Sequence, residues 1–174
     1  RLDHRHIALR LKRVIDIICA LAGSVVLALP AAIIYCAVRV DSRGPGIFVQ
    51  QRLGKQGVPF SLYKFRTMEH GAEARGSGIY TSRNDPRITR VGHLLRKTSL
   101  DELPQLVNVL RGDMSFVGPR PPLVAHPMPY AEYPPIERRR FEMAPGITGL
   151  AQVAGRNVLS WPERIRFDVE YVEN

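Results

Sequence analysis

The stretch VIDIICALAGSVVLALPAAIIYCAV, residues 14–38, decides how this chain is organised. It is apolar almost throughout, and Asp16 is its only acidic or basic residue. As a straight helix it would be about 37 Å long, enough to cross a hydrocarbon core of about 30 Å. A helix in a soluble core normally shows a polar face, and Leu29-Pro30-Ala31 is a poor signal-peptide cleavage site. The stretch therefore predicts contact with a membrane.

The flanks and the proline of this stretch favour a re-entrant path over a simple span. Positive charge marks the cytoplasmic side of a membrane segment, and here it stands on both sides. Pro30 removes one backbone hydrogen bond and favours a kink. We therefore expect a helix that is broken at Pro30 and leaves by the face it entered, although proline is also tolerated in spanning helices. The flanking basic residues are Arg10, Lys12 and Arg13 before the stretch, and Arg39 and Arg43 after it.

Composition and charge restrict the class of partner. The 174 residues are enough for one domain with a sizeable core, and the net charge of +9 calls for a polyanionic partner. An anionic membrane surface, a diphosphate substrate and nucleic acid all meet that demand. The arginines are scattered among Pro/Gly loops and are not interleaved with aromatic residues, which counts against nucleic acid. Cys19 and Cys36 both fall in the apolar stretch, so we expect buried small hydrophobes and neither a disulfide framework nor zinc.

The remainder of the chain predicts a small α/β (α+β) domain, mostly helical with a short β-hairpin, mounted on the N-terminal membrane helix. We expect residues 1–43 to form the basic flank and the membrane helix, and residues 44–174 the catalytic domain. Apolar periodicity and turn residues supply the boundaries. The expected elements are strands over 47–53 and 58–65, a surface loop over 69–85, helices over 88–97 and 99–112, an irregular segment over 117–135, and a last helix from Ser160.

The segment SLDELPQL, residues 99–106, is the most informative candidate for chemistry. Ser99 and Glu102 have the spacing of a capping box, and Asp101 would then complement the helix dipole. The same helix N-terminus would attract phosphate and help keep a nucleophilic carboxylate ionised. Arg96, just upstream, adds positive charge for a diphosphate. The capping and the catalytic interpretations are compatible.

Three further groups have weaker signals. Prolines around Arg120 would present its guanidinium rigidly to a phosphate, or form a turn that leaves it solvated. The glycines of residues 145–157, which also contain Arg156, permit close approach to a ligand or simply form turns. Lys64 and Arg66 lie on the second predicted strand, where they would bind substrate or line a solvated face. Ser160 and Glu163 predict a capping box with no chemistry.

Together these segments closely resemble the bacterial sugar transferase family, the monotopic polyprenyl-phosphate phosphoglycosyl transferases. The resemblance covers nearly the whole chain from Arg10, and the number and order of the matching runs make it specific. The runs are KRVID (12–16), GPGIF (44–48), QRLG (51–54), YKFRTM (63–68), SLDELPQL (99–106), GDMSFVGPRP (112–121) and PGITGLAQVAGRN (145–157).

The resemblance implies a reaction and a site. Asp101 and Glu102 match the catalytic Asp-Glu pair of the family: Asp101 would attack the β-phosphate of a UDP-sugar, release UMP and carry the phosphosugar until polyprenyl phosphate takes it. Mg²⁺, held at Asp101 and Glu102, would neutralise the diphosphate. Arg96 and Arg120 match positions close to the phosphates. Lys64, Arg66 and Arg156 complete the expected set of substrate-binding residues.

The resemblance also implies a location: the bacterial inner membrane, with the catalytic domain on its cytoplasmic face. The expected partners are the UDP-sugar, undecaprenyl (polyprenyl) phosphate and the bilayer, without nucleic acid, and the exposed membrane surface is compatible with a homodimer. Family members often have Ser before the proline, whereas this chain has Leu29, so the break would depend on Pro30 and its packing. Many also continue beyond the last helix, so we expect the 174 residues to be part of a longer protein.

Two other functions remain open from sequence. A plain glycosyltransferase would release UDP and would need a larger sheet than this chain offers. A membrane-tethered basic scaffold or binding module would need no catalysis, and the intact Asp101-Glu102 pair counts against it. The sequence does not name the sugar.

Overall fold

The computed structural model describes residues 2–74, 85–155 and 158–174. The chain forms two compact units, each of which is described by itself. The first comprises Arg1–Gly23, Gln50–Leu62 and Gln105–Asn174, and the second comprises Ser24–Val49 and Tyr63–Pro104. Helices and strands are mixed, with a β-hairpin, as the sequence predicted.

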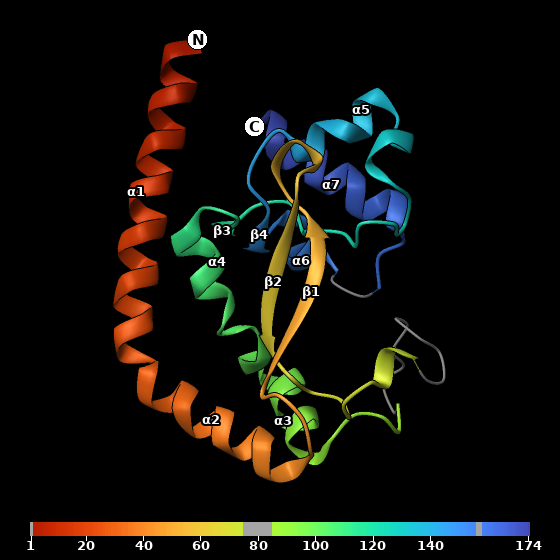
Figure 1. Cartoon of the computed structure of the whole chain (residues 1–174). Coiled ribbons are helices and arrows are strands. Elements are labelled where there is room, and N and C mark those ends of the chain that lie inside the picture. The colour runs from red at the N-terminus through yellow and green to blue at the C-terminus, as the bar shows by residue number, and fades with distance from the viewer. Residues whose placement is uncertain (1, 75–84, 156–157) are drawn as a thin grey trace. The chain divides into compact units, whose positions relative to one another are not determined.

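The N-terminal segment is two helices, α1 (Leu2–Val26) and α2 (Ala28–Asp41), bent by 63° at Leu27 (Figure 1). The sequence placed this break at Pro30, which in fact lies in the first turn of α2. Proline has no N–H and its ring collides with the carbonyl four residues earlier, here that of Val26, so the helix stops before it. The new helix starts with the Ala31 N–H, which donates to the Leu27 carbonyl at 2.8 Å.

The length and apolar composition of these two helices can be compared with those of a membrane span. Among the described residues, no single helix combines the length and the apolar composition of a membrane span, whereas the bent pair His6–Val26 and Ala28–Asp41 meets both criteria jointly. Cys19 and Cys36 are exposed, not buried as expected, because the helices turn these positions away from the rest of the protein. Many large apolar side chains are exposed as well: Ile7, Leu11, Val14, Ile15, Ile18, Leu21, Val25, Val26, Leu29, Ile33 and Val40.

The β-hairpin is formed by β1 (Ile47–Leu53) and β2 (Pro59–Phe65) and confirms the two predicted strands (Figure 1). Its turn is the short 3-10 helix η1 (Lys55–Gly57). Gln56 adopts φ +56° there, a left-handed conformation that is uncommon outside glycine. The tip of the hairpin belongs to the first unit and its base to the second.

In the first unit, two apolar clusters form the core. One joins Ala20 of α1, Leu62 of β2, and Val109 of α4 (Gln105–Arg111) with Met114. The other packs Leu53 against residues of η5 (Arg139–Phe141) and of α7 (Trp161–Glu173). The predicted capping box at the start of α7 is confirmed, since the Ser160 N–H donates to Glu163 at 2.8 Å. The remaining short elements of this unit are η4 (Tyr130–Glu132), α5 (Pro135–Arg138) and α6 (Leu150–Ala154).

Two three-residue strands of the first unit had no sequence signal. β3 (Ser115–Val117) and β4 (Gly146–Thr148) pair in parallel, with Ser115 opposite Gly146. Glycines allow the segments to approach at the backbone: a Cβ on Gly146 would lie 2.1 Å from the Gly118 nitrogen, and one on Gly149 would lie 2.2 Å from the Gly118 oxygen. These glycines therefore serve contact between backbone segments.

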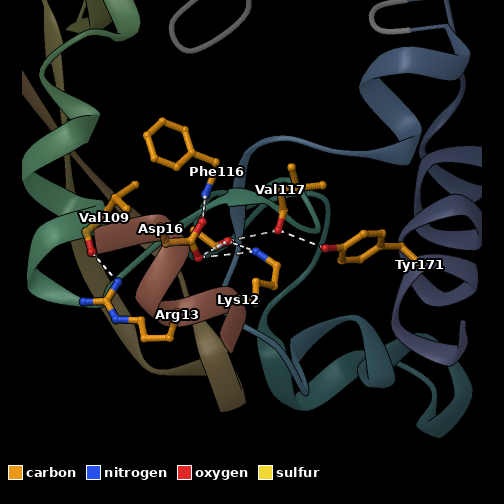
Figure 2. A network of polar contacts seen from close by, with 8 residues as sticks. Lys12, Arg13, Asp16, Val109, Phe116, Val117 and Tyr171 are labelled. Carbon is orange, nitrogen blue, oxygen red and sulfur yellow. Dashed lines mark hydrogen bonds and ion pairs between the residues drawn. The ribbon is translucent and has the colours of Figure 1, made fainter. Parts of the chain in front are cut away.

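Helix α1 is attached to the first unit by its charged residues (Figure 2). Asp16 is 5 % exposed and accepts hydrogen bonds from the Ser115 hydroxyl at 2.7 Å and the Phe116 N–H at 3.2 Å. Lys12 lies 3.4 Å from the same carboxylate. Arg13 donates to the Val109 carbonyl at 2.6 Å, at the end of α4. The acid in the apolar stretch is thus hydrogen-bonded to protein groups, as a buried carboxylate requires.

The second unit is built around Val38, Phe65 and Leu95. Its helix α3 (Arg90–Thr98) confirms the helix predicted over 88–97, and the Thr89 side chain caps it by accepting from the Gly92 N–H at 3.0 Å. Asp41, at the end of α2, accepts from the Val91 N–H at 2.9 Å and so joins the two helices. A short 3-10 helix, η2 (Ala72–Ala74), lies in the predicted surface loop, of which residues 75–84 are outside the described residues.

Candidate active site

Asp101 and Glu102 lie side by side on a short 3-10 helix, η3 (Leu100–Glu102), that directly follows α3. The helix predicted over 99–112 does not form as one element. Ser99 adopts φ +60° and ends α3, and its side chain makes no capping bond, so the predicted capping box is wrong. Pro104 explains the interruption, because it cannot supply the N–H that a continuous helix would need there.

Lys64 on β2 is the nearest cation with a described contact to this pair of acids. Its Nζ lies 3.0 Å from Oε1 of Glu102, and the two side chains are only 18 % and 19 % exposed. A partly buried ion pair is less screened than a surface one. Lys64 therefore fixes the Glu102 carboxylate and brings positive charge to the two acids.

Arg96 approaches the same acids from the last turn of α3. Its Nε donates to the Thr67 hydroxyl at 2.8 Å. Burial lowers the pKa of Arg96, while the charge of Asp101 raises it. Arg96 and Asp101 therefore lie within electrostatic reach of each other.

The electrostatics of Asp101 differ from the sequence expectation. A helix N-terminus was expected to keep this carboxylate ionised, but no such terminus is present. Burial raises the pKa of Asp101 and the neighbouring Glu102 adds to the rise, while Lys64 and Arg96 oppose it. The result is a half-buried carboxylate between two cations. Such a group is poorly hydrated, and it can approach an electron-poor phosphorus while the cations neutralise the phosphate oxygens.

Arg66 is buried and holds backbone carbonyls in place, which is a structural role. It is 4 % exposed, and its guanidinium donates to the carbonyls of Pro45 at 2.6 Å, Ser42 at 2.9 Å and Met68 at 3.2 Å. These carbonyls belong to the exit from α2 and to Met68, an isolated bridge residue shortly after β2. We therefore leave Arg66 out of the site, although the sequence analysis included it.

Sequence reasoning missed a buried Arg–Asp pair behind Arg96. Asp85 accepts two hydrogen bonds from the side chain of Arg87, at 2.9 and 2.7 Å, and one from its backbone at 3.0 Å. These bonds lower the pKa of Asp85 to about 2, and the charge of Asp85 acts in turn on Arg96. The signal in the sequence was an Asp-x-Arg spacing at the edge of a segment that otherwise indicated a solvated loop.

The other predicted residues lie elsewhere. Arg120 is exposed and belongs to the first unit, directly after the segment that packs on β4. Arg156 lies outside the described residues. The structure thus brings Lys64, Arg96, Asp101 and Glu102 together within the second unit and places Arg120 in the first.

The donor set at Asp101 and Glu102 is compatible with Mg²⁺ bound jointly with a substrate. Magnesium usually keeps several waters and is held by one or two carboxylates together with substrate phosphates. Within the described part of the chain, no group of three or more His, Cys, Asp or Glu residues is arranged as an all-protein metal site. Two adjacent half-buried carboxylates are the kind of ligand set that a diphosphate-bridged magnesium needs.

Comparison with known proteins identifies the family to which this chain is similar. The model of the family described as bacterial sugar transferase matches residues 7–174. The uncharacterised sugar transferase EpsL of Bacillus subtilis is 44 % identical over 168 residues, covering 94 % of this chain and 78 % of that protein. A UDP-glucose:undecaprenyl-phosphate glucose-1-phosphate transferase of Caulobacter vibrioides is 42 % identical over 167 residues, covering 93 % and 62 %. An undecaprenyl-phosphate galactose phosphotransferase of Salmonella typhimurium is 41 % identical over 179 residues, covering 94 % and 37 %.

Proposed function

The chain belongs to the bacterial sugar transferase family, and on that premise we propose that it transfers a sugar 1-phosphate from a UDP-sugar to undecaprenyl (polyprenyl) phosphate. The relatives from Caulobacter and Salmonella are named for this type of reaction. The observation that carries the proposal is the half-buried Asp101 carboxylate beside Lys64, Arg96 and Glu102. The product would be the lipid-linked sugar with which polysaccharide or glycoconjugate synthesis begins on the membrane.

The chemistry assigned to Asp101 is nucleophilic. One carboxylate oxygen forms a bond to the β-phosphorus while the bond from that phosphorus to the bridging oxygen breaks, and UMP leaves with both electrons of the broken bond. An oxygen of polyprenyl phosphate then attacks the same phosphorus and expels Asp101 as a free carboxylate. No proton is needed in either displacement, which is consistent with a site that has no histidine base in its assigned set.

The cations have separate roles in this proposal. Lys64 holds Glu102 and lowers the pKa of Asp101, so that more of it is ionised and ready to attack. Arg96, oriented by Thr67, neutralises charge that develops on the leaving phosphate. Asp101 and Glu102 would hold Mg²⁺, which supplies charge neutralisation for the diphosphate.

The position of the site follows from the acceptor. A polyprenyl phosphate keeps its phosphate at headgroup level, so the nucleophile must lie at the membrane interface. The exposed apolar faces of α1 and α2 favour insertion of this bent pair, with the catalytic residues on the cytoplasmic face of the inner membrane. Basic residues on both sides of the apolar stretch support a re-entrant path.

Nucleotide release tests the proposal. The chain in lipid nanodiscs is mixed with a panel of UDP-sugars, Mg²⁺ and undecaprenyl phosphate, and UMP is measured for the native protein, Asp101→Asn and the surface variant Glu173→Gln. We expect UMP with at least one sugar, retained in Glu173→Gln and lost in Asp101→Asn. With donor labelled at the β-phosphate and no acceptor, label should remain on the native protein and on Glu173→Gln, and not on Asp101→Asn. Release of UDP would indicate plain glycosyl transfer, and no release from a broad panel would favour a scaffold.

A further inference from the structure

Helix α3 of the second unit has two faces that are covered by protein. Val91 and Leu95 point into the core of the unit, where they pack with Val38 of α2. Gly92 lies against the segment that follows β2, since a Cβ at this position would be 2.0 Å from the Thr67 oxygen. The side of α3 that faces away from both contacts is left to the surroundings of the protein.

This outward side carries Arg90, Leu94 and Lys97, which are all exposed. Their spacing of four and three residues aligns them along one side of the helix, and we call them the α3 stripe. Leu94 is 60 % exposed. Helix α3 contains no acid, and among the described residues neither Arg90 nor Lys97 has an acidic partner. The α3 stripe therefore combines unneutralised positive charge with an exposed leucine.

Helix α2 lies beside α3 in the same unit and has a similar surface (Figure 1). Asp41, at the end of α2, accepts from the Val91 N–H at 2.9 Å. At this end of α2, Val40 is 88 % exposed, and Arg39 and Arg43 are exposed as well. Basic and apolar residues are thus exposed together on both helices where the two meet.

An anionic lipid surface matches this composition. Long Arg and Lys side chains can lay their aliphatic stems on an apolar layer while their charged ends reach phosphate groups. Anionic headgroups attract such residues, and an exposed leucine gains by entering the boundary between headgroups and acyl chains. A single exposed leucine is common on soluble proteins and would decide nothing. The informative feature is its place between Arg90 and Lys97, beside the exposed apolar residues of α2.

We propose that the α3 stripe binds the headgroup layer of an anionic membrane and so sets the level of the active-site acids; this inference rests on the proposed function. The 3-10 helix η3 follows α3 directly, so Lys97 is only four residues before Asp101. Leu100 stands between them and is 37 % exposed. A helix that rests on the headgroups therefore holds Asp101 near the level at which a polyprenyl phosphate presents its phosphate.

Tryptophan fluorescence tests the contact directly. Trp161 is the only tryptophan of the chain, so Trp161→Phe provides a background without tryptophan. In this background Leu94→Trp places a reporter in the α3 stripe. The matched control is Val153→Trp, at a position that is 80 % exposed on α6 of the first unit. In nanodiscs of anionic lipid brominated near the headgroup, we expect Leu94→Trp to be quenched several-fold more strongly than Val153→Trp and to emit at shorter wavelength.

The role of the charges is tested by two double variants. Arg90→Gln with Lys97→Gln removes both positive charges, whereas Arg90→Lys with Lys97→Arg keeps them. Quenching of Leu94→Trp should increase with the fraction of anionic lipid in the charge-keeping variant and lose this dependence in the neutral one. In anionic nanodiscs, KM for undecaprenyl phosphate should rise about tenfold in the neutral variant while kcat changes little, as expected for two basic residues at an anionic surface. Lys55→Gln, which removes an exposed charge from η1, should change neither quantity.

The outcomes separate the lipid contact from the reaction. Equal quenching of Leu94→Trp and Val153→Trp would overturn the inference. A shorter emission wavelength of Leu94→Trp without quenching would also overturn it, because protein, such as a second copy of the chain, would then cover the stripe. Quenching is measured without UDP-sugar, so it can be present when no UMP is released. That result would support the lipid contact and remove the proposed reaction, whereas UMP release without quenching would do the reverse.

Discussion

Two buried Arg–Asp pairs, one in each compact unit, have opposite effects on their carboxylates. Asp85 receives three hydrogen bonds from Arg87, and they lower its pKa to about 2. Asp168 receives one from the Arg140 side chain, leaves Oδ1 without a partner among the described residues, and has its pKa raised to about 6. Loss of hydration prevails at Asp168, whereas the hydrogen bonds from Arg87 prevail over loss of hydration at Asp85.

The two ion pairs therefore differ in whether their carboxylate changes its charge near physiological pH. The Asp85–Arg87 pair is local in sequence and stays ionised throughout the physiological pH range, as a fixed charge behind Arg96. The Asp168–Arg140 pair joins distant segments and titrates close to physiological pH. The Asp85–Arg87 pair acts on Arg96, the arginine that we assign to phosphate binding.

The largest expected effect comes from breaking the Asp168–Arg140 pair on one side only. Arg140→Ala should lower the free energy of unfolding by about 3–5 kcal/mol, because it leaves a buried carboxylate without its counter-charge. Arg140→Met with Asp168→Leu should lie within about 1 kcal/mol of the native protein or above it. Denaturant unfolding of both variants in the same detergent measures the difference. Equal losses in the two variants would show that packing, not charge, decides stability there.

The next largest expected effect is on the pH dependence of stability, which should differ between the two pairs. The ordinary pKa of an aspartate is 3.8, so the rise to about 6 makes the Asp168 contribution fall by about 3 kcal/mol as pH increases from 4 to 7. Asp168→Asn should remove this slope. For Asp85 the sign is reversed: its contribution is present above pH 4 and is lost as pH falls toward 2. Melting temperatures of both Asp→Asn variants from pH 2 to 8 test the two windows, and parallel profiles would contradict the assignment.

A smaller effect on stability is expected at Thr67, whose hydroxyl accepts a hydrogen bond from Arg96. Thr67→Val removes the hydroxyl that accepts from Nε of Arg96, so kcat/KM should fall about tenfold while stability changes by about 1 kcal/mol. Thr67→Ser keeps the hydroxyl and should retain activity. If Thr67→Ser were as impaired as Thr67→Val, the methyl group and not the hydrogen bond would be what matters.

The smallest effect is expected at the surface. The Arg139–Glu173 pair joins η5 and α7 just as Arg140–Asp168 does, but its side chains are 36 % and 43 % exposed. Solvent screening limits such a pair to about 0.5 kcal/mol, so Glu173→Gln should leave the melting temperature nearly unchanged. A large loss would mean that the connection between these elements matters irrespective of burial.

Parts of the fold were predictable because their signals are local. The apolar stretch of residues 14–38, the hairpin around residues 54–57 and the capping box of Ser160 with Glu163 each depend on residues close in sequence. Pro30 predicted a helix break but not its position. A proline ring collides with the carbonyl four residues before it and offers that carbonyl no N–H, so the helix breaks ahead of the proline. The helix expected from Ser99 was wrong because the effect of Pro104 exceeded that of a good capping pattern.

By itself the sequence determined the long apolar segment, the adjacent acids Asp101 and Glu102, and a set of candidate basic residues. Only the tertiary structure decided which of those bases face the acids. Lys64 and Arg66 are only two positions apart in the sequence. Lys64 nevertheless pairs with Glu102, whereas Arg66 donates to backbone carbonyls in the interior. The buried pairs Asp85–Arg87 and Arg140–Asp168 were likewise not recognised. Charge and spacing are local properties, whereas burial and hydrogen-bond partners depend on segments that meet only when the chain folds.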